Sequence, residues 1–240
     1  MTTKPLFQED AYLRTASATV LSHSAQGGVI LDASLFYATG GGQPGDGGQL
    51  TWDGMSCVIE NTIKGEEGAI ELVPSEGQTL PPVGSSVVQE LDWERRYGHM
   101  RVHTALHLLS VVIPLPVSGG SIGVAKGRLD FNMPEAPEDK TALQEQLQDL
   151  INRDLPVTED WITDVELSEN PQLIKTMSVS PPRGAGRVRL VRIGAGDAQV
   201  DLQPCGGTHV RTTAEIGRIR LGKVEKKGKI NRRVYLHLEE

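Results

Sequence analysis

Residues 92–114, DWERRYGHMRVHTALHLLSVVIP, decide the fold because the spacing of apolar residues changes within them. Four apolar residues recur there at steps of three or four, which is the spacing of one helix face: Val102, Leu106, Leu109 and Ile113. Asp92 is placed to cap the start of such a helix, and Pro114 to end it. The stretch therefore predicts a long helix between an upstream part with strand-like spacing and a downstream part with mixed helical and strand-like spacing.

Upstream of this helix, short apolar segments alternate with turn residues, and six such segments can be read: 18–21, 28–31, 48–52, 57–60, 69–73 and 86–91. Segments of this length, separated by glycine-rich turns, are typical of a small antiparallel barrel or sandwich. We therefore expect residues 1–92 to form a small β-barrel-like domain. Cys57 falls inside one segment, where a buried core thiol is the simplest interpretation.

Downstream of this helix, helical and strand-like spacings are mixed. A second helix is indicated by an apolar stripe: Leu143, Leu147, Leu150, Ile151 and Leu155. Strand-like runs follow at 161–165, 187–193 and 199–202, and the last part of the chain carries a hairpin signal over 217–224 and 232–238. This mixture predicts an α+β domain over residues 93–240.

The composition excludes several classes of protein. The chain has 240 residues, 38% of them hydrophobic and 23% charged, which is the balance of a globular protein rather than a disordered or collagen-like one. No apolar run reaches the ~18 residues that a membrane helix needs, and the N-terminus lacks the apolar core of a signal peptide. Two cysteines cannot build a disulfide framework. We expect a soluble cytoplasmic protein, either a monomer or a weak homo-oligomer.

The charge is distributed unevenly along the chain. The formal net charge is −7, yet residues 181–240 hold 13 basic and 6 acidic side chains. A basic last quarter on an acidic protein favours an anionic partner at one surface, because local potential steers a ligand more than total charge does. The alternative at this point is a solvated hairpin that carries its lysines and arginines without a partner.

Four side chains have the spacing and chemistry of metal ligands. His103 and His107 in HTALH lie four residues apart on the predicted helix, so both rings project from one face. Cys205 and His209 in PCGGTHV enclose two glycines, which let the backbone fold a thiolate and an imidazole around one centre. A thiolate and three imidazoles are the number and type of ligands that tetrahedral Zn²⁺ accepts, so we expect one zinc ion per chain.

The same histidine spacing occurs in metalloproteases of the His-Glu-x-x-His kind. Here Thr104 follows the first histidine, so the glutamate that would activate water is absent, and that interpretation is disfavoured. Four protein ligands leave open whether the metal is structural or catalytic.

A glycine-rich motif, FYATGGGQPGDGG, covers residues 36–48. The three consecutive glycines Gly40, Gly41 and Gly42 permit a close backbone approach to a partner, and Gln43 and Asp46 could aim polar groups into that space. The motif lacks the Lys-Ser/Thr ending of a phosphate-binding loop, so binding of ATP is not expected. A wide turn between barrel strands is the alternative interpretation.

Together and in this order, GGGQPGDG (40–47), HTALH (103–107) and PCGGTH (204–209) resemble the free-standing alanyl-tRNA editing proteins of the AlaX family. These are similar to the editing domain of alanyl-tRNA synthetase. The resemblance extends over nearly the whole chain, including RLDF at 128–131, the run at 178–184 and GKVEKKG at 222–228.

The resemblance implies a barrel-like domain with the glycine-rich motif, and an α+β domain that binds zinc through the four residues named above. It also implies hydrolysis of the ester that joins a wrong amino acid, chiefly serine, to tRNA for alanine. Rejecting alanine requires a polar group that pairs with the serine hydroxyl. Our catalytic candidates are Thr104 and Gln43. Synthetase editing domains often carry a hydroxyl residue immediately before the second histidine, where this chain has Leu106.

Further contacts follow from the same resemblance. We expect substrate-binding residues at these positions: Thr39, Gly40, Gly41, Gly42, Asp46 and Thr208. The basic tail then becomes a surface for the tRNA backbone through six cations: Lys223, Lys226, Lys227, Lys229, Arg232 and Arg233. Two other functions remain open, a noncatalytic RNA-binding module with a structural zinc and a metal hydrolase for small esters or amides.

Overall fold

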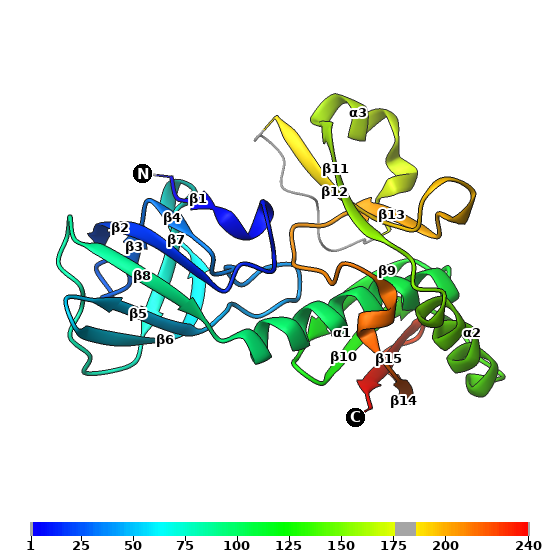
Figure 1. Ribbon diagram of the computed structural model, residues 1–240. Coiled ribbons are helices and arrows are strands. Elements are labelled where there is room, and N and C mark those ends of the chain that lie inside the picture. Colours follow the sequence, from blue (N-terminus) through cyan, green and yellow to red (C-terminus); the bar gives the residue numbers. More distant parts are fainter. Residues whose placement is uncertain (1, 176–185, 240) are drawn as a thin grey trace. The chain divides into compact units, whose positions relative to one another are not determined.

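The computed structural model describes residues 2–175 and 186–239 (Figure 1). The chain divides into two compact units, Met1–Tyr97 and Gly98–Glu240. The run at 178–184 that contributes to the family resemblance lies outside the described residues. In the described part of the chain, no helix combines the length and the apolar character that crossing a membrane would require.

The first unit contains a closed six-stranded barrel in the order β2-β3-β7-β6-β5-β8. Its strands are β2 (Thr15–His23), β3 (Val29–Leu31), β5 (Gly48–Trp52), β6 (Met55–Lys64), β7 (Ile70–Pro74) and β8 (Ser86–Leu91). Beside the barrel, β1 (Lys4–Pro5) pairs in parallel with β4 (Ala33–Ser34). The barrel predicted from the alternating segments is therefore confirmed.

Strand alternation fills the barrel interior. Along β8, Val87, Gln89 and Leu91 are buried while the residues between them are exposed, which is the period of two that a half-buried strand requires. Cys57 is fully buried in this core, and burial raises the pKa of its thiol. The sequence-based interpretation of Cys57 as an inert core residue agrees with this position.

A buried ion pair holds the end of the glycine-rich motif in the first unit. Arg96 and Asp46 are both fully buried, and Arg96 Nε donates to Asp46 Oδ2 at 2.9 Å. The same carboxylate accepts the backbone N–H of Tyr37 at 2.6 Å, and the guanidinium also donates to the carbonyl oxygens of Ala11 and Leu35. One arginine thereby fixes three separate segments of the chain.

Helix α1 (Trp93–Val112) begins where the sequence predicts, because the Asp92 carboxylate accepts the backbone N–H of Arg95 at 3.1 Å. In the second unit, α1 packs closely on a four-stranded sheet of order β14-β15-β10-β9. A Cβ atom at Gly127 would come within 2.6 Å of Val102 and 3.0 Å of Leu106, so only glycine admits the helix at this distance. The four strands are β9 (Val117–Ile122), β10 (Lys126–Asn132), β14 (Ile219–Lys226) and β15 (Asn231–Leu238).

Helix α2 (Lys140–Asn152) lies against the edge strand of this sheet. Gln144 and Gln148 accept the backbone N–H groups of Leu221 and Ile219 with their side-chain carbonyls. The pairing satisfies edge groups of β14 that would otherwise be available to another strand. The predicted stripe includes Leu155, which lies beyond the end of the helix but is buried.

A second sheet of the same unit has the order β11-β12-β13, formed by β11 (Val157–Thr163), β12 (Arg187–Ile193) and β13 (Asp201–Pro204). The strand expected at 161–165 ends at Thr163 instead. Thr163 and Glu166 form a capping box that starts helix α3 (Asp164–Glu169), so a local helix signal ends the strand. With two sheets and three helices described, the α+β assignment is confirmed.

Candidate metal centre

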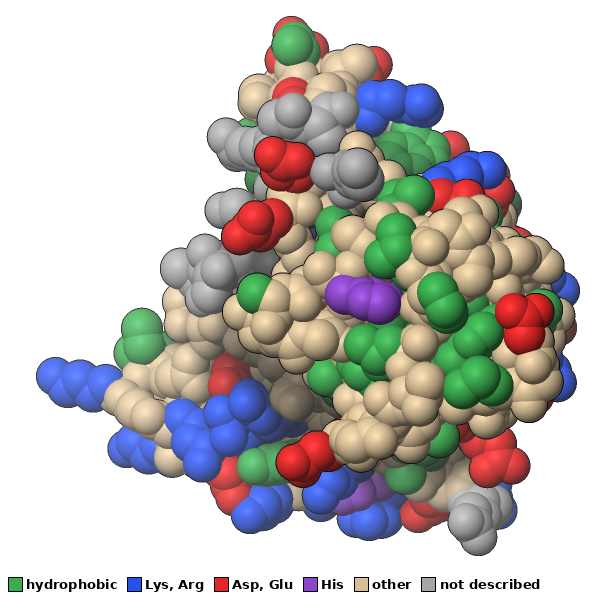
Figure 2. Space-filling model, turned by 90° about the vertical axis from the view of Figure 1, so that its left-hand side faces the viewer, with side chains coloured by type: hydrophobic (Ala, Val, Ile, Leu, Met, Phe, Trp, Pro, Cys, Tyr) green, Lys and Arg blue, Asp and Glu red, His purple; other side chains and the backbone are tan. Residues whose placement is uncertain are grey.

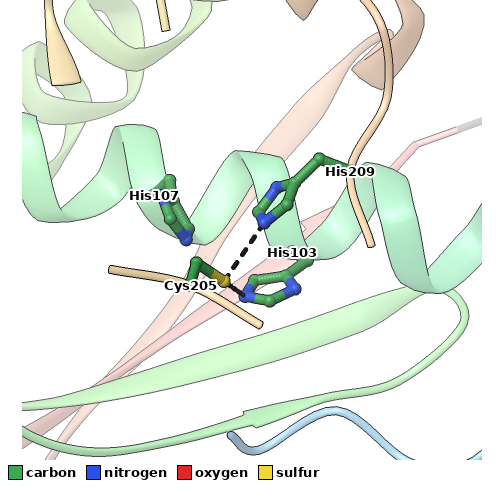
Figure 3. Close-up of side chains that lie close together, drawn as sticks. All are labelled: His103, His107, Cys205 and His209. Atoms are coloured by element: carbon green, nitrogen blue, oxygen red, sulfur yellow. Dashed lines mark hydrogen bonds between the residues drawn. The ribbon is translucent and has the colours of Figure 1, made fainter. Parts of the chain in front are cut away.

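Two histidines project from one face of α1 toward the same point (Figure 3). His103 and His107 lie one helical turn apart, and their ring centroids are 5.2 Å from each other. Both side chains are almost completely buried. The helix predicted from the apolar spacing therefore presents this pair as a preformed half of a metal site.

Cys205 and His209 come from the loop that follows β13. Arg189, which is buried on β12, donates to the carbonyl oxygens of Cys205 at 2.9 Å and Gly207 at 2.8 Å, and it forms an ion pair with Glu159. The planar guanidinium of this arginine fixes the loop by binding two of its carbonyl oxygens. The position of the loop is thus fixed by hydrogen bonds to its backbone carbonyl oxygens, since its glycines have no side chains that could fix it.

The structure brings all four predicted ligands together. Their potential ligand atoms lie within 4.8 Å of one another. Cys205 Sγ is 3.5 Å from His103 Nε2 and 3.3 Å from His209 Nε2, as the dashed lines in Figure 3 show. The cluster could hold one metal ion.

The electrostatics of the cluster suit a cation. Burial alone would raise the pKa of Cys205, but the neighbouring His103 and His209 outweigh it and hold that pKa well below its usual value. Burial, together with the charge of His103, holds the pKa of His209 well below its usual value. A thiolate beside a neutral imidazole is the protonation state in which these side chains bind metal, so the donor set fits a zinc ion.

A second layer of side chains supports His107, and the sequence analysis missed it. His107 Nδ1 lies 3.0 Å from Asp201 Oδ2, and the buried Asp201 also forms an ion pair with Lys175 and accepts from Gln203 Nε2 at 2.7 Å. Burial opposes the charge on both partners, yet their hydrogen bond raises the pKa of His107 to about 9 and lowers that of Asp201 to about 2. The field at this point therefore favours positive charge.

A signal for this layer was present in the sequence. Asp201, Gln203 and Cys205 occupy alternate positions, so a strand places all three side chains on one face. An acid and an amide on the same face as a cysteine ligand are typical of groups that orient metal-bound histidines.

Thr104 lies next to the fourth ligand. Its hydroxyl donates to the Met100 carbonyl at 2.9 Å, accepts the Val210 backbone N–H at 3.3 Å, and lies 3.1 Å from His209 Nδ1. Because the hydroxyl proton is committed to Met100, the last contact is satisfied when His209 Nδ1 donates. That leaves the Nε2 lone pair of His209 facing the cluster.

Comparisons with known proteins bear on the whole chain. Residues 188–235, which include Cys205 and His209, match the Threonyl and Alanyl tRNA synthetase second additional domain, and residues 11–95 match tRNA synthetases class II (A). The alanyl-tRNA editing protein AlaX-M of Methanosarcina acetivorans is 33% identical over 98% of this chain and 99% of its own length. The chain belongs to the AlaX-M family.

Other relatives agree with this assignment to the AlaX-M family. The AlaX-M protein of Methanosarcina barkeri is 32% identical over 98% of this chain and 99% of its own length. The alanine–tRNA ligase of Pyrobaculum calidifontis is 36% identical over 93% of this chain, but the chain spans only 25% of that ligase. The family resemblance stated from the three motifs is confirmed.

In this AlaX-M family member, the glycine-rich motif forms a tight turn in the first unit. Gly40 and Gln43 exchange backbone hydrogen bonds, and Gly41 and Gly42 have φ values of +57° and +84° that favour glycine. Gln43 is fully buried. The Thr39 hydroxyl donates to the Thr62 carbonyl at 3.1 Å and accepts the Gly45 N–H at 2.8 Å.

The substrate-binding roles expected for this motif stay predictions. Asp46 is engaged by Arg96, and Thr39 by its neighbours, so both have structural contacts in the first unit. Thr208, beside His209 in the second unit, is almost completely buried.

The cations of the last hairpin in this AlaX-M chain differ in their contacts. Lys223 and Lys227 pair with Glu225, whose pKa they lower to about 2, while Arg233 pairs with Asp130 and Arg232 donates to the Pro134 carbonyl. Lys226 and Lys229 are exposed, and no ion pair among the described residues involves them. On the face of the molecule drawn in Figure 2, Lys and Arg side chains lie next to Asp and Glu side chains. Contact with tRNA phosphates stays a prediction for all six.

Proposed function

We propose that this chain removes a wrong amino acid, chiefly serine, from tRNA for alanine by hydrolysing the aminoacyl ester. The observation that carries the proposal is the convergence of His103, His107, Cys205 and His209 in a chain of the AlaX-M family. A cytoplasmic location, where tRNA is charged and used, goes with this proposal.

In this proposal the four residues hold one Zn²⁺. When bound, Zn²⁺ supplies a Lewis acid that orients the aminoacyl group or the water and favours charge on the ester oxygen. Cys205 is only partly buried and the adjacent Gly206 is exposed, so an ester can approach the cluster from this side. Backbone without a side chain at Gly206 leaves room for that approach.

The serine hydroxyl needs a partner that alanine leaves unsatisfied, a discrimination of about 1–3 kcal/mol per buried polar group. The hydroxyl of Thr104 already has a full set of contacts, so we assign it a positioning role toward His209 rather than contact with serine. A role of Gln43, Gly40, Gly41 and Gly42 in recognising the amino acid stays a prediction, because all four belong to the first unit and Gln43 is fully buried there.

Asp201 is expected to hold His107 in the orientation that binds metal. Exchange of Asp201→Asn should lower the affinity for Zn²⁺ by about 10–100-fold, because the amide cannot accept a charge-assisted bond from His107 Nδ1 as a carboxylate does. The measurement is competition for Zn²⁺ with a chelator of known affinity.

The matched control is Asp197→Asn, which exchanges an exposed acid four residues earlier in the chain. If the Asp201 variant binds zinc as tightly as this control, Asp201 does not contribute to metal binding. Equal melting temperatures of the two zinc-loaded variants at saturating Zn²⁺ would separate weakened binding from misfolding.

The proposed function is tested by deacylation of serine-charged alanine tRNA. Zinc-loaded protein should release serine much faster than buffer and should release correctly attached alanine slowly. Release no faster than buffer by folded, metal-loaded protein would overturn the proposal. The double variant Lys226→Ala/Lys229→Ala adds a test of RNA contact. The slope of log KM against log salt concentration should fall by about 0.7–0.9 for each phosphate contact that is lost.

A further inference from the structure

A large aromatic side chain is exposed on the strand at the edge of the second sheet. Trp161 lies on β11 with 40% of its surface exposed. In the sheet register, Trp161 is directly opposite Arg189, and Cys205 N donates to the Arg189 carbonyl at 3.1 Å. Trp161, Arg189 and Cys205 therefore form a row across three neighbouring chain segments. At about 4.8 Å per strand, the backbones of Trp161 and Cys205 are roughly 10 Å apart.

All three side chains belong to the face of the sheet that carries the metal cluster. Residues directly opposite each other in an antiparallel pair point to the same side. On this side Arg189 contacts Glu159, and Asp201 contacts His107. Trp161 is thus an exposed extension of the surface that presents Cys205.

Trp161 is accompanied by a cation. The guanidinium of Arg187 lies over the indole, 5.2 Å from the ring centroid, and Arg187 is exposed. The nearby Glu159 is already neutralised by Arg189. A flat aromatic ring with an arginine beside it offers stacking to a nucleobase and charge to a phosphate.

We propose that Trp161 and Arg187 form a subsite for the terminal nucleoside of the aminoacylated tRNA. This inference rests on the proposed function, which places the ester at the metal cluster. The ester joins the amino acid to the ribose of that nucleoside. The base of the nucleoside must therefore lie no farther from the cluster than the length of one nucleoside. Trp161, two strands from Cys205 on the same face, lies in that range, and Arg187 would contact the adjoining phosphate.

The test compares two substrates that share the seryl ester and differ in the alcohol part, which is adenosine in seryl-adenosine and a methyl group in serine methyl ester. In zinc-loaded Trp161→Ala, the preference for seryl-adenosine, measured as the ratio of the two KM values, should fall by about 5–150-fold, the usual effect of losing one stacked base. Trp161→Phe keeps a ring and should retain most of the preference. Val165→Ala, at another exposed apolar residue, is the matched control. An unchanged ratio in Trp161→Ala would overturn the inference.

A binding measurement separates this inference from the proposed function. Adenosine 5′-monophosphate should quench tryptophan fluorescence of the full-length protein, and Trp161→Phe should abolish that quenching, because Trp52 is buried in the barrel and the Trp93 ring is already stacked on Tyr97 and covered by Arg14. Arg187→Ala should weaken binding of the monophosphate more than binding of adenosine. Quenching by Trp161 in a protein that fails to deacylate seryl-tRNA would support the subsite and overturn the proposed function. Deacylation of seryl-tRNA with no quenching and no effect of Trp161→Ala would support the proposed function and overturn the subsite.

Discussion

Exchange of Cys205→Ser should remove the metal, the deacylase activity and much of the stability of the second unit together. The thiolate is the one anionic ligand among four, and a serine hydroxyl is a poor replacement because it does not ionise near neutral pH. If Zn²⁺ is present at about a thousand times its dissociation constant, it stabilises the folded chain by about 4 kcal/mol. Loss of that contribution should lower the melting temperature by roughly 8–16 °C for a chain of this size.

Metal analysis, the serine deacylation assay and thermal unfolding measure these three effects. Cys57→Ala is the matched control, since Cys57 is the other cysteine and lies in the barrel core. It should keep about one zinc per chain and lose only the stability that a small core cavity costs. Treatment of the unaltered protein with a chelator should reproduce the Cys205→Ser melting temperature. A Cys205→Ser protein that retains full zinc content would show that the ligand set is wrong.

Exchange of Arg96→Ala should destabilise the first unit by about 3–5 kcal/mol, the usual result of removing one partner from a buried ion pair. Asp46 would be left as a buried carboxylate with no cation, and among the described residues its Oδ1 already has no hydrogen-bond partner. The carbonyl oxygens of Ala11 and Leu35 would lose their donor as well.

Urea unfolding of the full-length chain in a Trp161→Phe background, where tryptophan fluorescence comes from Trp52 and Trp93 of the first unit, measures this loss. Arg14→Ala is the control, because it removes a cation that stacks on Trp93 without a buried charge partner, and it should cost about 1 kcal/mol or less. Zinc content should stay near one per chain in Arg96→Ala, since all four proposed ligands belong to the second unit. Equal stability losses in the two variants would contradict the structural importance of the pair.

Local patterns were sufficient to predict most elements of the fold. The six strands of the barrel, α1, α2 and the last hairpin follow from apolar spacing and turn residues. Strands β9 and β10 were missed because their sequences, VSGGSI and KGRLDFN, are rich in glycine and charge. The reason for Gly127 appears only when α1 packs on the sheet, since its missing side chain makes room for Val102 and Leu106. Such tertiary effects override strand propensity.

The candidate site also contains residues that the sequence predicts and residues that it does not. The four ligands were predictable because few side chains bind zinc and their spacings fit a helix and a glycine loop. Asp201 and Arg189 were not predicted, because the first acts through a side-chain hydrogen bond to His107 on α1 and the second through carbonyl oxygens of a loop. Thr104 was assigned to catalysis from its position, whereas its contacts in the structure favour a role in orienting His209.

The alternation of Asp201, Gln203 and Cys205 also restricts how the length of this strand can vary. Insertion or deletion of a single residue between Asp201 and Cys205 would turn the carboxylate or the thiolate to the opposite side of the sheet, because strand side chains alternate with a period of two. A change of two residues would restore the orientation while shifting the carboxylate by one pair along the strand. Natural variants of this chain should therefore keep the spacing between these two residues constant and place their insertions beyond it, in the turn between Ile193 and Asp201.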